Sequence, residues 1–376
     1  MAGIYIHIPF CKKACHYCNF HFSTSLQHKN ELLDCLVQEI VLQKNYLNHE
    51  RIDTIYFGGG TPSLLDASSL HAIVENIKNH HDISPNVECT LEANPDDLTQ
   101  EKLKQFAAIG INRLSIGIQS FHEEDLQYMN RSHSAAQAIQ CVAFAQQAGI
   151  QNISVDLIFG FPVLSHSKWE QNIDQVLQMN VPHISCYAMT VEPQTALAHQ
   201  IDKKISAPIN AEQSAEQYVY LMQALAKADY NHYEISSFAK ENKQSQHNSN
   251  YWKGISYLGI GPSAHSFNGD TRQWNKANNA EYIRNIHNHI VPFELEELTT
   301  AQKINEKIMI SLRTANGLDA TQIKKMMTAK QFHLLNTMMD TFTKNEMIFV
   351  ENDFWKLTNK GKLFADHIAS ELFVEA

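Results

Sequence analysis

The sequence predicts an α/β protein whose main part is an incomplete (β/α) barrel, followed by a smaller α+β domain. Short runs rich in β-branched and aromatic residues alternate with segments of helical periodicity as far as about residue 230. This alternation is typical of a parallel sheet with crossover helices. Six such βα units end by about residue 230, whereas a full eight-unit barrel typically needs about 250 residues. The expected fold is therefore a (β/α)6 partial TIM barrel.

The expected strands are the short apolar runs. They are residues 4–8, 54–57, 87–92, 113–118, 153–159 and 183–189. Apolar residues at helical spacing predict intervening helices, for example over 30–47, 67–79, 135–148 and 168–179. In such a barrel, functional groups gather where the strands end and the βα loops begin.

The chain is expected to divide into three regions. Residues 1–230 form the barrel, and residues 231–295 are a loop-rich connecting region with the motifs HNSNYW and YLGIGPSAHSF. Residues 296–376 contain helical runs, then two short strands around a turn and a further helix, which predicts a winged-helix-like domain. Because acidic residues accompany the basic ones in this region, a docking or lid role is favoured over DNA binding.

The composition excludes several classes of protein. The net charge of −10 argues against a nucleic-acid partner, since phosphate binding needs basic patches. The apolar stretches are too short for an integral membrane segment, and the N-terminus MAGIYIHIPFC lacks the pattern of a secretory signal. A cytoplasmic location is therefore expected, with the seven cysteines as thiols. Cys35, Cys89, Cys141 and Cys186 lie in apolar or periodic segments, which predicts buried structural thiols.

The remaining three cysteines form the motif C-x3-C-x2-C directly after the first strand. They are Cys11, Cys15 and Cys18. Three thiolates bind three irons of a [4Fe-4S] cluster and leave the fourth iron open for the amino and carboxylate groups of S-adenosylmethionine (SAM). With the aromatic Tyr17 before the last cysteine, the motif is typical of radical SAM proteins. A zinc site is the alternative, because His16 and His21 are near in sequence.

Further polar groups follow the other expected strands. Gly58–Pro62 exposes backbone groups and lets a ligand approach closely, although a simple tight turn would have the same sequence. Glu92 could accept hydrogen bonds from ribose hydroxyls. Arg131 offers a bidentate fork for a carboxylate, and Gln119 and Asp156 lie in or at the end of strands. A purely structural ion pair is the alternative for these groups.

Motifs spread over nearly the whole chain resemble those of one family. In order they are YIHIPFCKKACHYCNF, FGGGTPS, LEANPDDL, RLSIGIQSF, VDLIFGFP and HNSNYW. They resemble the oxygen-independent coproporphyrinogen III oxidase-like family of radical SAM proteins, and in particular its haem-chaperone branch. The resemblance implies a partial barrel with one [4Fe-4S] cluster, SAM and haem. It implies cluster ligands at Cys11, Cys15 and Cys18, and SAM contacts at Tyr5, Tyr17, Gly59, Gly60, Thr61, Glu92, Gln119, Arg131 and Asp156.

Departures from the oxidases favour the haem-chaperone branch. The oxidases carry the pattern C-x3-C-x2-C-x-C, where this chain has Phe20, and a longer segment before the motif, where only ten residues precede Cys11 here. The HNSNYW motif matches an element of haem chaperones, so the resemblance implies a haem contact at His247, with Tyr251 and Trp252 over a porphyrin face.

The expected activity is to bind haem and transfer it to an acceptor haem protein, with a reductant or electron donor serving the cluster. Radical-based decarboxylation of coproporphyrinogen III is the alternative.

Overall fold

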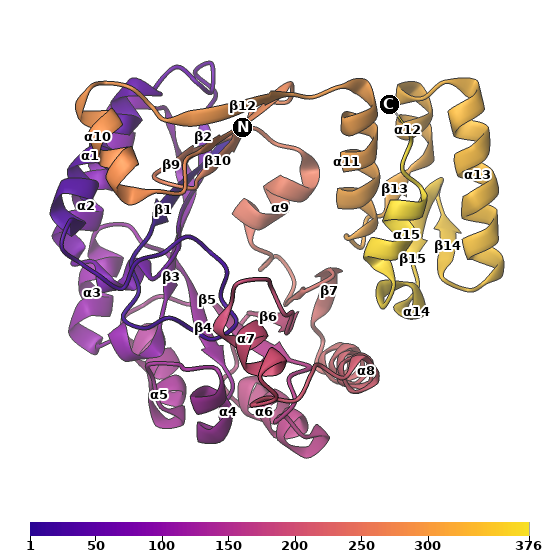
Figure 1. The fold of residues 1–376 in the computed structure, drawn as a ribbon, viewed down its shortest axis with the longest axis horizontal. Coiled ribbons are helices and arrows are strands. Elements are labelled where there is room, and N and C mark those ends of the chain that lie inside the picture. The colour runs from indigo at the N-terminus through magenta and orange to yellow at the C-terminus, as the bar shows by residue number, and fades with distance from the viewer. Residues whose placement is uncertain (376) are drawn as a thin grey trace.

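The computed structural model describes residues 1–375, and its main feature is one curved, twelve-stranded sheet (Figure 1). Six strands at its centre are neighbours in chain order and run parallel to one another. They are β1 (Ala2–Ile8), β2 (Ile52–Gly59), β3 (Ile83–Ala93), β4 (Arg113–Gln119), β5 (Asn152–Phe159) and β6 (His183–Ala188). The predicted parallel partial barrel is confirmed.

Helices link these strands and lie on the outside of the sheet (Figure 1). They are α1 (Lys29–Leu42), α2 (Ala67–His80), α3 (Gln100–Ala108), α4 (Glu123–Tyr128), α5 (Ala135–Gln147), α6 (His166–Gln178), α7 (Ala196–Asp202) and α8 (Ala211–Lys227), with short 3-10 turns η1 (Pro62–Leu64) and η2 (Pro95–Asp97). Six of these helices begin with side-chain caps, in which a side-chain oxygen accepts a hydrogen bond from a backbone N–H of the first turn. The capping residues are Asp66, Thr99, Ser134, Ser165, Thr195 and Asn210. The sheet is therefore covered on its outer face.

The segment 231–295 differs from the expectation of a loop-rich connection, because it adds six strands to the same sheet. They are β7 (Asn231–Glu234), β8 (Ser237–Ala239), β9 (Tyr257–Ile260), β10 (His265–Phe267), β11 (Thr271–Asn275) and β12 (Phe293–Glu297), with helices α9 (Gln246–Lys253) and α10 (Asn279–His287) between them. Strand β9 pairs parallel with β1, and β10 to β12 continue antiparallel beyond it. These strands have three to five residues, which is too short for alternating hydrophobicity to identify them.

The C-terminal region forms a smaller unit with its own three-stranded sheet, ordered β13-β15-β14. Its elements are α11 (Thr300–Leu312), β13 (Leu318–Asp319), α12 (Ala320–Met326), α13 (Ala329–Lys344), β14 (Ile348–Glu351), β15 (Phe354–Leu357), α14 (Asn359–Lys362) and α15 (Ala365–Glu371). A separate hydrophobic cluster, which includes Ile308, Met339 and Trp355, forms its core. Five helices and this small sheet form the predicted smaller α+β domain.

Helix α9 lies between the large sheet and the C-terminal unit (Figure 1), and it contacts both β2 and α11. The first turn of α9 is held by Glu88 of β3, whose carboxylate accepts hydrogen bonds from the backbone N–H groups of Gln246 and His247 at 3.1 and 3.0 Å. The negative charge at this N-terminus also complements the helix dipole. The HNSNYW motif is thus anchored to the inner side of the barrel.

Four cysteines, Cys35, Cys89, Cys141 and Cys186, are buried thiols, as predicted. Within residues 1–375, the helices are too short or too polar to cross a lipid bilayer.

Candidate functional site

The loop between β1 and α1 carries the three clustered cysteines, and all three side chains are half-buried. A bridge between Phe10 and Ser23 closes the base of this loop. Burial raises the pKa of the Cys11 thiol to about 11, although Thr61 donates a hydrogen bond to its Sγ at 3.4 Å. Burial likewise raises the pKa of Cys18. These thiols therefore keep their protons until a cation displaces them.

The three thiols line one cavity of about 550 Å³, which we call the cluster cavity. Within residues 1–375, no three His, Cys, Asp or Glu side chains meet closely enough to hold a single metal ion. In a [4Fe-4S] cube each cysteine binds a different iron, so the sulfur atoms need not converge on one point. The arrangement of the thiols is thus compatible with a cluster.

The glycine turn after β2 brings backbone close to the cysteine loop. Gly59 has φ +103°, a conformation that favours glycine. A Cβ atom at Gly60 would lie 2.7 Å from the carbonyl oxygens of Ile8 and Phe10, so a side chain there would collide with backbone. Thr61 N–H donates to the Phe10 carbonyl at 2.7 Å and fixes the turn against the cysteine loop. A ligand in the cluster cavity can therefore contact main chain directly.

Glu92, at the end of β3, is the central carboxylate of the cluster cavity. Tyr56 Oη donates to its Oε1 at 2.8 Å, and the Gly59 N–H donates to its Oε2 at 3.1 Å. Burial raises the pKa of Glu92 to about 7, against the opposing effect of the Tyr56 hydrogen bond. Asp156 on β5 accepts hydrogen bonds from Ser115 and Ser154, and burial raises its pKa as well.

Arg131 is the central cation of the cluster cavity. It donates to Cys15 Sγ at 3.2 Å, and to Asn94 Oδ1 and the Gly117 carbonyl at 2.7 Å each. Burial acts to lower the pKa of Arg131, but the neighbouring Tyr17 and Cys15 raise it above its ordinary value. Arg131 thus places a positive charge beside the Cys15 side chain.

Gln119, the last residue of β4, has φ +70°, which is strained for a non-glycine residue. Its buried Oε1 atom has no hydrogen-bond partner within the described part of the chain. Strain of this kind persists only where the surroundings enforce it, and it is often found at ligand sites.

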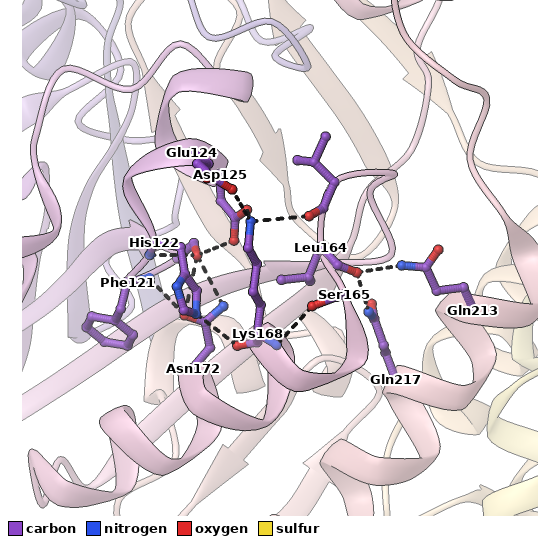
Figure 2. A network of polar contacts seen from close by, with 12 residues as sticks. Phe121, His122, Glu124, Asp125, Leu164, Ser165, Lys168, Asn172, Gln213 and Gln217 are labelled. Carbon is purple, nitrogen blue, oxygen red and sulfur yellow. Dashed lines mark hydrogen bonds and ion pairs between the residues drawn. The ribbon is translucent and has the colours of Figure 1, made fainter.

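A polar network anchors the loop that follows Gln119 (Figure 2). The Phe121 N–H donates to Asn172 Oδ1 at 2.8 Å, and Lys168 of α6 donates to Asp125 Oδ1 at 3.2 Å. On the other side of α6, Gln217 of α8 donates to the Leu164 carbonyl at 2.9 Å. The loop is thus tied to α6, and the start of α6 is tied to α8.

The cluster cavity brings together all the predicted cluster and SAM residues except Tyr5. Those on its wall are Cys11, Cys15, Cys18, Tyr17, Gly59, Gly60, Thr61, Glu92, Gln119, Arg131 and Asp156. Gly59 and Gly60 leave room at the main chain, Arg131 lies beside Cys15, and Gln119 Oε1 has no partner within the described residues. These features fit a [4Fe-4S] cluster that binds an amino-acid ligand.

The sequence analysis missed several other lining residues. The main group lies at the end of β6 and directly after it, and includes Tyr187, Met189, Thr190 and Glu192. Their position at the end of the sixth expected strand was the available signal, because the ends of parallel strands and the loops after them meet at one rim.

A second cavity of about 560 Å³ adjoins the first, and we call it the aromatic cavity. It is bounded by residues from both ends of the chain: Tyr5, His7, Asn19, Phe20, His21, Gly59, Glu92, Tyr251, Trp252, Gly254, Ile255, Tyr257, Ser263, His265, Phe267, Arg272, Glu306 and Ile310. Asn19, Phe20, Gly59 and Glu92 line both cavities. Phe20 is 68% exposed, which is unusual for so large an apolar side chain. Tyr5 lies on this second wall.

His247, the predicted haem contact, does not line either cavity. Its ring is buried behind Tyr251, with Nδ1 paired to Thr54 Oγ1 and Nε2 paired to Tyr251 Oη, each at 2.8 Å. Burial lowers the pKa of His247 to about 3, so the ring is neutral. With both nitrogens engaged, His247 is not available as an iron ligand in this structure, and the expectation of direct contact is corrected. Tyr251 and Trp252 do line the aromatic cavity.

Comparison with known proteins agrees with this geometry. Residues 5–176 match the radical SAM superfamily. The chain is 33% identical to heme chaperone HemW of Bacillus subtilis (strain 168) across 98% of both chains. It is 31% identical to heme chaperone HemW of Haemophilus influenzae across 99% of this chain and 97% of that protein.

The solved structure of coproporphyrinogen III oxidase (HemN) from Escherichia coli has the same fold. Its TM-score is 0.87 at 22% identity, over 99% of this chain and 90% of that one. The full-length likeness to the two HemW proteins is closer in sequence. This chain therefore belongs to the HemW family of the radical SAM superfamily.

Proposed function

We propose that this protein is a haem chaperone, which binds haem in the aromatic cavity and transfers it to an acceptor haem protein. The observation that carries the proposal is the aromatic cavity itself, which adjoins the cluster cavity and shares a wall with it. Its volume lies in the range of pockets for small molecules and cofactors, and half of its lining residues are aromatic side chains or histidines. The relatives named heme chaperone point to the same cargo.

The cluster cavity is the proposed place of the [4Fe-4S] cluster and SAM that the radical SAM superfamily implies. Cys11, Cys15 and Cys18 would hold the cluster, which when reduced supplies an electron to the sulfonium of SAM. The cationic Arg131, which donates a hydrogen bond to Cys15 Sγ, would orient the SAM carboxylate.

The remaining polar groups of the cluster cavity would position the rest of SAM. Glu92 accepts hydrogen bonds in the structure and would accept those of the ribose hydroxyls. The exposed backbone of Gly59 and Gly60, together with Gln119 and Asp156, would complete the pocket. Tyr17 is half-buried beside Cys15 and would shield the cluster from water.

In the aromatic cavity, Tyr251 and Trp252 would cover one side of the porphyrin. His247 would act indirectly, since it holds the Tyr251 hydroxyl from behind. Tyr5 stacks on Tyr56 with 6.0 Å between ring centroids and would continue this aromatic surface. Glu306 and Ile310 of α11 form the opposite boundary, so the C-terminal unit would act as a lid.

The proposal is tested with anaerobically reconstituted protein that carries its cluster. Haem is added and the Soret band is followed, and the haem-loaded protein is then mixed with an acceptor apoprotein. We expect about one haem per chain and its loss to the acceptor. Stable retention of haem in the presence of several acceptors would contradict the chaperone function.

The rival function is tested in parallel with coproporphyrinogen III, SAM and a reductant. Many turnovers to decarboxylated product would show an oxidase instead. The variant with Cys11, Cys15 and Cys18 all replaced by alanine is the matched control, because the oxidase requires the cluster. Haem binding should persist in that variant, because the aromatic cavity has its own lining.

A further inference from the structure

Three histidines line the aromatic cavity, from segments far apart in the sequence. His7 is the penultimate residue of β1, His21 follows the clustered cysteines, and His265 begins β10. A neutral imidazole is a common axial ligand of haem iron, provided that one ring nitrogen is free. The hydrogen bonds of each ring therefore decide which histidine could bind iron.

Both ring nitrogens of His7 form hydrogen bonds. Its Nδ1 pairs with Tyr5 Oη at 3.2 Å and its Nε2 pairs with the His21 carbonyl at 2.9 Å, and the ring is only 5% exposed. His21 uses its Nε2 to bind Asn279 Oδ1 at 2.7 Å. To bind iron, the His7 ring would have to break one of its two hydrogen bonds. The His21 ring would have to use its Nδ1 atom or break its hydrogen bond to Asn279.

His265 differs from both. Within residues 1–375, neither of its ring nitrogens forms a hydrogen bond, and the side chain is exposed at the cavity. Its ring stacks against Trp274 on the neighbouring strand, with centroids 6.0 Å apart and planes inclined by 27°. Stacking limits the ring's rotation and leaves both nitrogens unpaired.

The backbone that leads into His265 is held by an unusual buried group. Glu39 of α1 is fully buried and accepts hydrogen bonds from the Gly261 N–H at 2.8 Å, Asn275 Nδ2 at 2.7 Å and Tyr282 Oη at 2.6 Å. Burying a carboxylate is costly unless it is fully hydrogen bonded. This buried group fixes the turn at Gly261, where φ is +102°, four residues before His265.

The surroundings of His265 suit a flat metalloporphyrin. Tyr257 and Phe267 provide aromatic surface on the same wall. Arg272 lies 5.7 Å over the Phe267 ring and is ion-paired with Glu306, so a propionate would share its guanidinium with that carboxylate. An aromatic surface and the ring of His265 therefore meet in one cavity.

We propose that His265 is the axial ligand of haem iron in the aromatic cavity. This inference rests on the proposed function, because it assumes haem as the cargo. A lone pair of the neutral imidazole of His265 replaces a solvent ligand on the iron, and no electron is transferred. The residue that binds the iron thus lies on β10, and Tyr251 and Trp252 of the HNSNYW motif supply the opposing aromatic surface.

The test uses full-length, cluster-loaded protein and ferric haem b as the probe. We expect His265→Ala to weaken haem binding by about tenfold or more, a free-energy change of about 1.4 kcal/mol, and to remove the spectrum of imidazole-ligated iron. Added imidazole should restore that spectrum. His21→Ala is the matched control, and it should keep the wild-type spectrum.

Iron-free protoporphyrin IX separates ligation from folding, because it binds the cavity without an axial ligand. Its affinity should be equal in wild type and His265→Ala. An unchanged haem spectrum in His265→Ala, or loss of imidazole ligation in His21→Ala instead, would overturn the assignment. If the wild type itself binds no haem, the proposed function fails; if it binds and transfers haem while His265→Ala behaves identically, only the ligand assignment fails.

Discussion

Replacing Glu92 by glutamine should make the stability of the barrel less dependent on pH. In the folded protein burial raises the pKa of Glu92 from 4.5 to about 7. Between these two values the folded state keeps a proton that the unfolded state has released, so stability falls as pH rises through this window. One pKa unit corresponds to about 1.4 kcal/mol, which gives a loss of up to about 3 kcal/mol by neutral pH. A glutamine resembles the protonated carboxyl and should not show this loss.

The assay is urea unfolding of wild type and Glu92→Gln, measured under identical anaerobic conditions from about pH 5 to about pH 8. The free-energy difference between the two proteins should shift in favour of the variant as pH rises. Glu170→Gln, at an exposed position on α6, is the control and should follow the wild type at every pH. Parallel curves for wild type and Glu92→Gln would refute the argument that burial of Glu92 places its titration near neutrality.

Three further outcomes are expected. Cys15→Ala should lose the cluster and its visible absorption while the fold is kept, as measured by iron content and circular dichroism; a full complement of iron would exclude Cys15 as a ligand. Gly60→Ala should lower stability by about 1–3 kcal/mol and weaken SAM binding, because the new Cβ would meet backbone atoms 2.7 Å away. Trp169→Phe should cost about 1–3 kcal/mol in thermal or urea unfolding, because it leaves the buried Gln217 carbonyl without the indole N–H that donates to it at 2.9 Å; unchanged stability would show that the carbonyl finds another donor.

Much of the barrel could be predicted from the sequence, because strands buried on both faces leave continuous apolar runs. In β1, six of seven residues are buried, and this run is plain in the sequence. The cluster cavity followed from the same pattern, since the ends of parallel strands meet at one rim and bring Glu92 and Asp156 together.

The aromatic cavity could not be predicted in the same way. It depends on the pairing of β9 with β1, which places Ile260 beside Ile6, and on the approach of α11. Periodicity reports local structure and carries no information on which distant segments pair. The role of His247 was misjudged for a related reason, since its partner Thr54 lies 193 residues away in the chain.

On the proposed function, the wall shared by the two cavities would couple the binding of their two ligands. Asn19, Phe20, Gly59 and Glu92 face both spaces, so a ligand that orders these residues on one side alters what a second ligand meets on the other. Such coupling is reciprocal: if SAM changes the affinity for haem by some factor, haem must change the affinity for SAM by the same factor. If the proposed function holds, the cellular supply of SAM would then influence the loading and unloading of haem, without any change in the covalent state of either molecule.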